Sequence, residues 1–112
     1  MDKKIGKAWV KALRSGKYAQ ARGYLEKIDK KNKPRYCCLG VLQKCVLKLP
    51  ILSTKETELS LKAQNMAKMS TSYGEYGRTR RDEDSPCLAT LNDSGRNFLK
   101  IADIIEKHMD EL

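Results

Sequence analysis

The stretch that decides the fold is LNDSGRNFLKIADIIE, residues 91–106 of the 112-residue chain. Its polar first residues and Gly95 predict a tight turn, and the apolar spacing after them predicts an amphipathic helix over about 96–110. The pattern is similar to the opening of a helix-turn-helix, with Ile101 and Ala102 at the positions of its packing pair. Only six residues follow the stretch and the end of the chain is acidic, so we expect no recognition helix that enters a DNA groove. We expect this helix to build the core instead.

Apolar residues recur at helical spacing in several segments N-terminal to this stretch. The expected helices cover residues 3–15, 18–28, 36–48, 54–69 and 86–93. The helix over 36–48 is apolar on nearly every side, which is typical of a central helix. Residues near 70–85 lack this period and predict one irregular loop or a short hairpin. The fold class predicted is therefore all-α: a compact bundle of four to five helices in a single domain, residues 1–112.

Local signals indicate where these helices begin and end. Gly16 can take the left-handed conformation that ends the first helix, and Gly23 weakens the second by about 1 kcal/mol of helix propensity. Ser53 followed by Glu56 forms a candidate capping box for the fourth. Gly40, inside the apolar helix, would let a neighbouring backbone approach closely.

Charge is unevenly distributed along the chain, whose net charge is +9. Residues 1–48 hold 14 lysines and arginines against 3 acidic residues, whereas residues 49–112 hold 9 against 11. A basic half of this kind suggests a face that meets phosphate or an acidic protein surface. The candidate binding residues are Lys4, Lys7, Lys11, Arg14, Lys17, Arg22, Lys30, Lys31, Lys33 and Arg35. The alternative is that these side chains only keep a small helical protein in solution.

The residues that usually carry catalysis or bind metals form no recognisable pattern. The four cysteines, Cys37, Cys38, Cys45 and Cys87, lack zinc spacing, and we expect them to be buried as small hydrophobic residues. The single histidine, His108, lies near the C-terminus, where only the fold could bring it to a cysteine. The acidic run at 82–84, with arginines beside it, is typical of a charge-balanced surface loop. We therefore expect no catalytic residue, no metal and no cofactor, and a protein that is not an enzyme.

The chain contains no targeting or membrane signal that we recognise. No apolar run approaches the roughly 18–20 residues that span a bilayer, and the basic N-terminus leads into a periodic helix instead of a secretory apolar core. We expect a cytoplasmic protein without a membrane partner. For Asn92 and Asp93, a turn or capping role is a better explanation than ligand contact, because both side chains bond nearby backbone N–H groups in tight turns.

Three sequence blocks together resemble a widespread family of small, largely uncharacterised bacteriophage proteins. The blocks are WVKALRSGKY at 9–18 with Gln20, Gly23 and Leu25 after it; YCCLGVL at 36–42; and LNDSG at 91–95, followed by Phe98, Ile101-Ala102-Asp103 and Ile105-Glu106. They occur in the family's order and cover about half of the chain. Members of that family often carry a tryptophan and a glycine after the second block, and residues 66–73 here have neither.

The resemblance implies a phage gene product that acts in the bacterial host cytoplasm, but it implies no activity. Combined with the basic half, it leads to the hypothesis of a non-enzymatic accessory protein, an inhibitor that binds and blocks a host protein or nucleoprotein of antiviral defence. Two alternatives stay open. One is direct binding of DNA or RNA; the other is sequestration of a small nucleotide signal, which would need a pocket lined by arginine and lysine.

Overall fold

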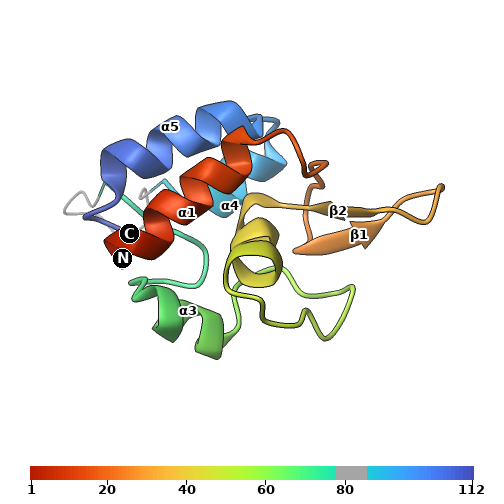
Figure 1. The fold of residues 1–112 in the computed structure, drawn as a ribbon, viewed down its shortest axis with the longest axis horizontal. Coiled ribbons are helices and arrows are strands. Elements are labelled where there is room, and N and C mark those ends of the chain that lie inside the picture. Colours follow the sequence, from red (N-terminus) through yellow and green to blue (C-terminus); the bar gives the residue numbers. More distant parts are fainter. Residues whose placement is uncertain (78–85) are drawn as a thin grey trace.

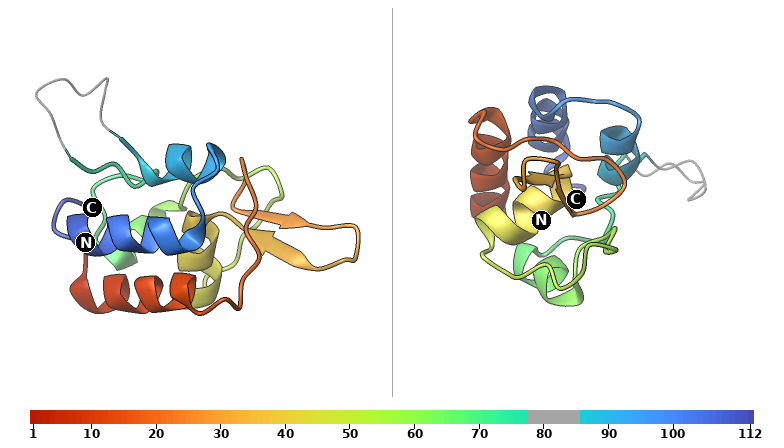
Figure 2. Two further views of the ribbon diagram at one scale, coloured as in Figure 1. Left: turned by 90° about the horizontal axis from the view of Figure 1, so that it is seen from above. Right: turned by 90° about the vertical axis from the view of Figure 1, so that its right-hand side faces the viewer.

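In the computed structural model, which describes residues 1–77 and 86–112, the helices α1 (Lys3–Arg14) and α5 (Phe98–His108) lie side by side (Figures 1 and 2). They run antiparallel: the amine of Met1 donates to the Met109 carbonyl over 3.2 Å, and Arg14 at the far end of α1 reaches Asp103. The remaining elements are β1 (Glu26–Ile28), β2 (Pro34–Tyr36), α2 (Cys38–Gly40), η1 (Val41–Val46), α3 (Leu61–Ala67) and α4 (Leu88–Asp93). Among the helices described, none is long and apolar enough to cross a membrane.

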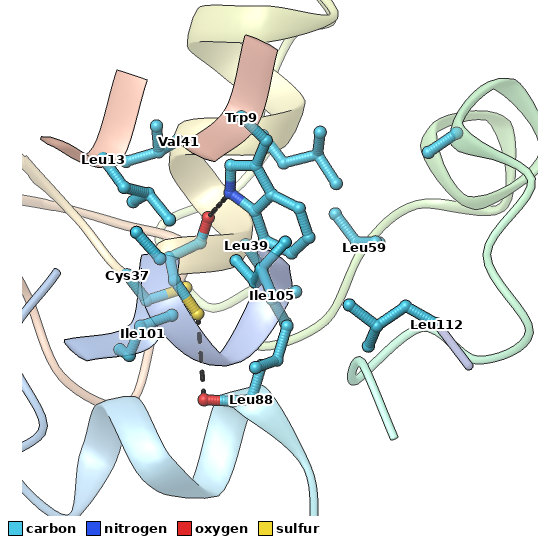
Figure 3. Close-up of a cluster of buried hydrophobic side chains, with 14 of the residues drawn as sticks. Trp9, Leu13, Cys37, Leu39, Val41, Leu59, Leu88, Ile101, Ile105 and Leu112 are labelled. Carbon is cyan, nitrogen blue, oxygen red and sulfur yellow. Dashed lines mark hydrogen bonds between the residues drawn. The ribbon is translucent and has the colours of Figure 1, made fainter. Parts of the chain in front are cut away.

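The core lies where α1, α2 and α5 meet (Figure 3). Trp9 is fully buried there, and its indole Nε1 donates to the carbonyl oxygen of Cys38 over 2.9 Å. Ile101 and Ala102, the packing pair of the C-terminal stretch, are also fully buried. Burial of a large apolar side chain stabilises a fold by about 1.5–3 kcal/mol, so this contact between the two ends of the chain is a main source of stability.

The prediction of an all-α fold is wrong, because a two-stranded antiparallel sheet replaces the helix expected over 18–28. Strands β1 and β2 pair with Lys27 opposite Arg35. Tyr36, at the end of β2, also bonds to the segment before β1: its N–H donates to the Ala19 carbonyl over 2.9 Å, and its carbonyl accepts from Ala21 over 2.8 Å. These pairings between distant residues override a weak helical pattern that Gly23, at φ +83°, already interrupts.

The expected apolar helix over 36–48 is present as two shorter pieces, α2 and the wider π-helical segment η1. Leu39, Val41 and Leu42 in them are fully buried, as expected for a central element. The close approach predicted at Gly40 is confirmed, since a Cβ built there would lie 1.9 Å from the carbonyl oxygen of Leu25. No larger residue fits at this position unless the Leu25 backbone moves.

The helices expected over 3–15, 86–93 and 96–110 are confirmed to within one or two residues at each end, as α1, α4 and α5, but the helix expected over 54–69 is shorter. The helix expected over 54–69 begins only at Leu61, because Ser60 caps it by accepting from the Ala63 N–H over 3.1 Å. Glu75, within the predicted loop near 70–85, forms one antiparallel bridge with Cys87, which follows that loop. The predicted charge-balanced loop at 78–84 lies outside the described residues. Gly16 and Gly95 have the positive φ that their positions predicted, +74° and +107°.

Candidate functional site

All ten basic residues predicted to bind a partner are exposed, but they lie on separate parts of the fold. Lys4, Lys7, Lys11 and Arg14 lie on α1; Lys17 and Arg22 lie on the connection to β1; and Lys30, Lys31, Lys33 and Arg35 lie on the β1–β2 hairpin. This hairpin, residues 26–36, projects at the end of the molecule opposite the two termini (Figures 1 and 2). We call it the basic arm. The single basic face expected from the sequence is therefore divided between a helix and the arm.

Asp29 orders the tip of the basic arm. Its Oδ1 accepts from the backbone N–H groups of Lys31 and Lys33, each over 2.9 Å, and its Oδ2 accepts from the Arg35 side chain over 3.3 Å. The N–H of Lys33, followed by that of Lys31 and by the guanidinium of Arg35, lowers the pKa of Asp29. Asn32 completes the turn at φ +61°, a conformation that Asn tolerates better than most residues. One carboxylate thus holds the loop that presents three lysines.

The arm keeps most of its positive charge. Within residues 1–77 and 86–112, no carboxylate lies within ion-pair distance of Lys30, Lys31 or Lys33. Sequence reasoning missed Lys27, which lies on the same arm with its ammonium 4.9 Å from the centre of the Tyr24 ring. Because residues 18–28 were expected to form a helix, nothing in the sequence around Lys27 indicated that it lies on a hairpin. The arm therefore offers an ordered cluster of cations beside an exposed aromatic ring.

Arg14 has a different environment from the other predicted residues. Its Nη1 donates to Oε2 of Glu106 over 3.0 Å and its Nη2 donates to Asp103 over 2.8 Å. Glu106 and then Asp103 raise the pKa of its guanidinium. Arg14 therefore ties α1 to α5 and has few N–H groups left for a partner. The acidic residues of the C-terminal half thus neutralise one end of the helical basic face.

A groove of about 720 Å³ runs along the seam between α1 and α5. We call it the α1–α5 groove. Its lining combines two apolar residues with basic and acidic side chains. The lining residues are Lys3, Lys7, Val10, Lys11, Arg14, Ser15, Glu106, Lys107, Met109 and Asp110. Lys3 and Lys107 were not among the predicted site residues, although the four-residue spacing of Lys3, Lys7 and Lys11 was a signal that could have included Lys3.

Asn92 and Asp93 connect the three sequence blocks through hydrogen bonds. Asn92 is fully buried; its Oδ1 accepts from the Cys38 N–H over 3.1 Å and from the Gln20 amide over 2.8 Å, and its Nδ2 donates to the Ala21 carbonyl over 2.8 Å. Asp93 accepts from the Gly23 N–H over 2.7 Å. Apart from the bond from Asn92 Nδ2 to Asp93 Oδ1 over 3.2 Å, the partners of these two side chains are distant residues, not those of a local turn. Asn92 and Asp93 therefore join distant segments of the fold, a role wider than the local turn or cap that the sequence predicted.

The cysteines and the histidine do not form a shared site in the described structure. Of the four cysteines expected to be buried, Cys37 and Cys38 are, whereas Cys45 and Cys87 are only half-buried. Burial raises the pKa of Cys37 to about 11 and that of Cys38 well above its usual value. His108 instead pairs with Glu111 and lies against the Tyr76 ring, with 4.7 Å between ring centres. Among the residues that the structure describes, no group of three histidine, cysteine or acidic side chains is arranged to hold a metal ion.

Comparison with known proteins places the chain in a family without assigning it an activity. No curated protein matches the chain and no solved structure does so. The family described as Domain of unknown function (DUF8296) matches residues 1–71. This match includes α1, the basic arm and the apolar α2–η1 segment, and ends before the C-terminal stretch. Because it covers more than half of the 112 residues, the chain belongs to the DUF8296 family.

Proposed function

We propose that this protein is a non-enzymatic bacteriophage accessory protein that binds and blocks a host component through its basic N-terminal half. The target class that fits is a nucleoprotein of antiviral defence in the host cytoplasm. The mechanism is occlusion: the bound protein covers an acidic surface, or the path that nucleic acid takes over the target. Blocking of this kind needs stoichiometric amounts and no turnover.

The observation that carries the proposal is the basic arm. It projects from the body, and the Asp29 carboxylate orders its tip by accepting two backbone N–H bonds. An ordered loop loses less conformational entropy on binding than a mobile one, so its lysines bind more strongly for the same contacts. The phage assignment depends on the three sequence blocks and remains part of the proposal.

A second candidate function is direct binding of DNA or RNA, favoured by the shape of the arm. A two-stranded β-ribbon is one of the elements that the DNA major groove admits, and lysines on it would contact phosphate. Tyr24, exposed beside Lys27, could stack on a base. This candidate predicts affinity for nucleic acid alone, whereas the leading proposal requires a host protein.

Affinity capture from bacterial host lysate, with and without nuclease, separates the two candidates. The bait is the purified protein, compared with an arm variant, K30E/K31E/K33E. The matched control, K55E/K62E/K100E, makes the same change in net charge at exposed lysines outside α1 and the arm. We expect the wild type and the control to recover the same host protein after nuclease treatment, and the arm variant to lose it. Recovery of nucleic acid only, or equal recovery by the arm variant, would overturn the proposal.

A further inference from the structure

The α1–α5 groove is a second surface whose chemistry points to a particular kind of partner. Its floor contains Val10, which is 5% exposed, and the half-buried Met109. Its rim is cationic along α1, with Lys7 and Lys11, whereas on the α5 side Lys107 of the last turn lies with Glu106 and Asp110. A surface that is apolar at the floor and charged at the rim matches the anatomy of protein interfaces.

The lysines of α1 form a regular row along this groove. Lys3, Lys7 and Lys11 are four residues apart, so they lie on the same side of the helix with a rise of about 6 Å from one to the next. Lys3 lies 4.0 Å from Asp110 in an exposed ion pair. For Lys7 and Lys11, no carboxylate of the described residues is within ion-pair distance. The charges of Lys7 and Lys11 are therefore not neutralised by an ion pair with a described residue, and they are one helical turn apart.

We propose that the α1–α5 groove binds an acidic amphipathic helix of a partner protein. Acidic residues at i and i+4 of such a helix are also about 6 Å apart along its axis, so they would pair with Lys7 and Lys11. Apolar residues on the same helix would cover Val10 and Met109, which is the usual form of helix-in-groove recognition. Packed against the seam, the helix would lie beside α1 and α5 as a third helix.

A nucleotide fits this groove less well than a helix does. Lysines in a row do not converge on one phosphate, because Lys3 and Lys11 are separated by about 12 Å along the axis. Arg14, the residue best suited to bidentate phosphate binding, is already paired with Glu106 and Asp103. This inference rests on the proposed function in one respect: both require that the target contains a protein.

Titration with defined peptides tests the groove without any host target. The probe is a labelled peptide of about 15 residues with leucines on one face and glutamates at i and i+4, and the reference peptide has lysines in place of the glutamates. Fluorescence anisotropy at low salt compares the wild type with K7E/K11E. The matched control is K55E/K62E, whose residues are exposed but do not line the groove. Circular dichroism checks that each variant remains folded.

We expect the wild type and K55E/K62E to bind the acidic peptide equally, and K7E/K11E to bind it at least about tenfold more weakly. In NMR spectra, the amides that shift should be those of α1 and α5. Absence of binding, equal loss in both variants, or preference for the lysine peptide would overturn the inference. ATP that shifts the groove amides when the acidic peptide does not would favour a nucleotide site instead. Capture of a host protein from lysate tests the basic arm, whereas the peptide titration tests the groove. A negative capture experiment therefore does not change the interpretation of the peptide titration.

Discussion

Replacing Asn92 by alanine should destabilise the protein more than any other single polar-to-alanine change in the described part of the chain. The Asn92 side chain satisfies the buried N–H of Cys38 and the buried carbonyl of Ala21, and it accepts from Gln20. In N92A both backbone groups lose their partner inside the core. A buried polar group left unsatisfied costs about 1–3 kcal/mol, so the two together predict a loss of about 2–6 kcal/mol.

This loss is a large fraction of the roughly 5–15 kcal/mol by which such domains are stable. Urea unfolding followed by tryptophan fluorescence measures it, because the chain has one tryptophan and Trp9 is fully buried. The control is N65A at an exposed position of α3, for which we expect a change within about 0.5 kcal/mol. A loss below about 1 kcal/mol in N92A would refute the reasoning that the third sequence block holds the fold together.

Three further predictions follow from the same structure. In G40A the added Cβ meets the Leu25 carbonyl oxygen at 1.9 Å, so we expect a stability loss of about 1–3 kcal/mol or more in urea unfolding; unchanged stability would contradict the close approach. The pKa of Asp29 is lowered in the folded state, so its stabilising effect is present above about pH 4 and is lost as the pH falls through the folded pKa. The stability difference between wild type and D29N should therefore shrink below about pH 4, and a pH-independent difference would count against the carboxylate's role. Cys37, whose pKa is raised to about 11, and Cys38 are both buried, so iodoacetamide at neutral pH should label them only when urea unfolds the protein. Mass spectrometry measures the labelling, and equal rates for the folded and the unfolded protein would disprove this prediction.

Local signals in the sequence predicted the parts of the fold that depend on neighbouring residues. The first and last helices follow from apolar spacing, and Gly16 and Gly95 have the backbone conformation that their positions require. The hairpin was missed because its strands are only three residues long and its stability comes from Tyr36 pairing with the chain before β1. Such pairing leaves no periodic pattern in the strands themselves.

The candidate site was predictable in composition but not in arrangement. Charge asymmetry indicated the ten basic residues, and all ten are exposed. The pairing of Arg14 with Asp103 and Glu106 joins residues about 90 positions apart, and only the packing of α1 on α5 brings them together. The same packing creates the α1–α5 groove and adds Lys107 to it. The separation of the arm from α1 likewise depends on the strands that sequence reasoning missed.

The most direct test of the central claim is the salt dependence of binding to the host component recovered after nuclease treatment. Apparent affinity is measured over a series of salt concentrations for the wild type, K30E/K31E/K33E and the control K55E/K62E/K100E. If the basic arm makes the contact, affinity falls steeply with salt for the wild type and the control, and the arm variant binds weakly with a shallower dependence. Equal affinities and equal salt dependence in all three proteins would contradict the account.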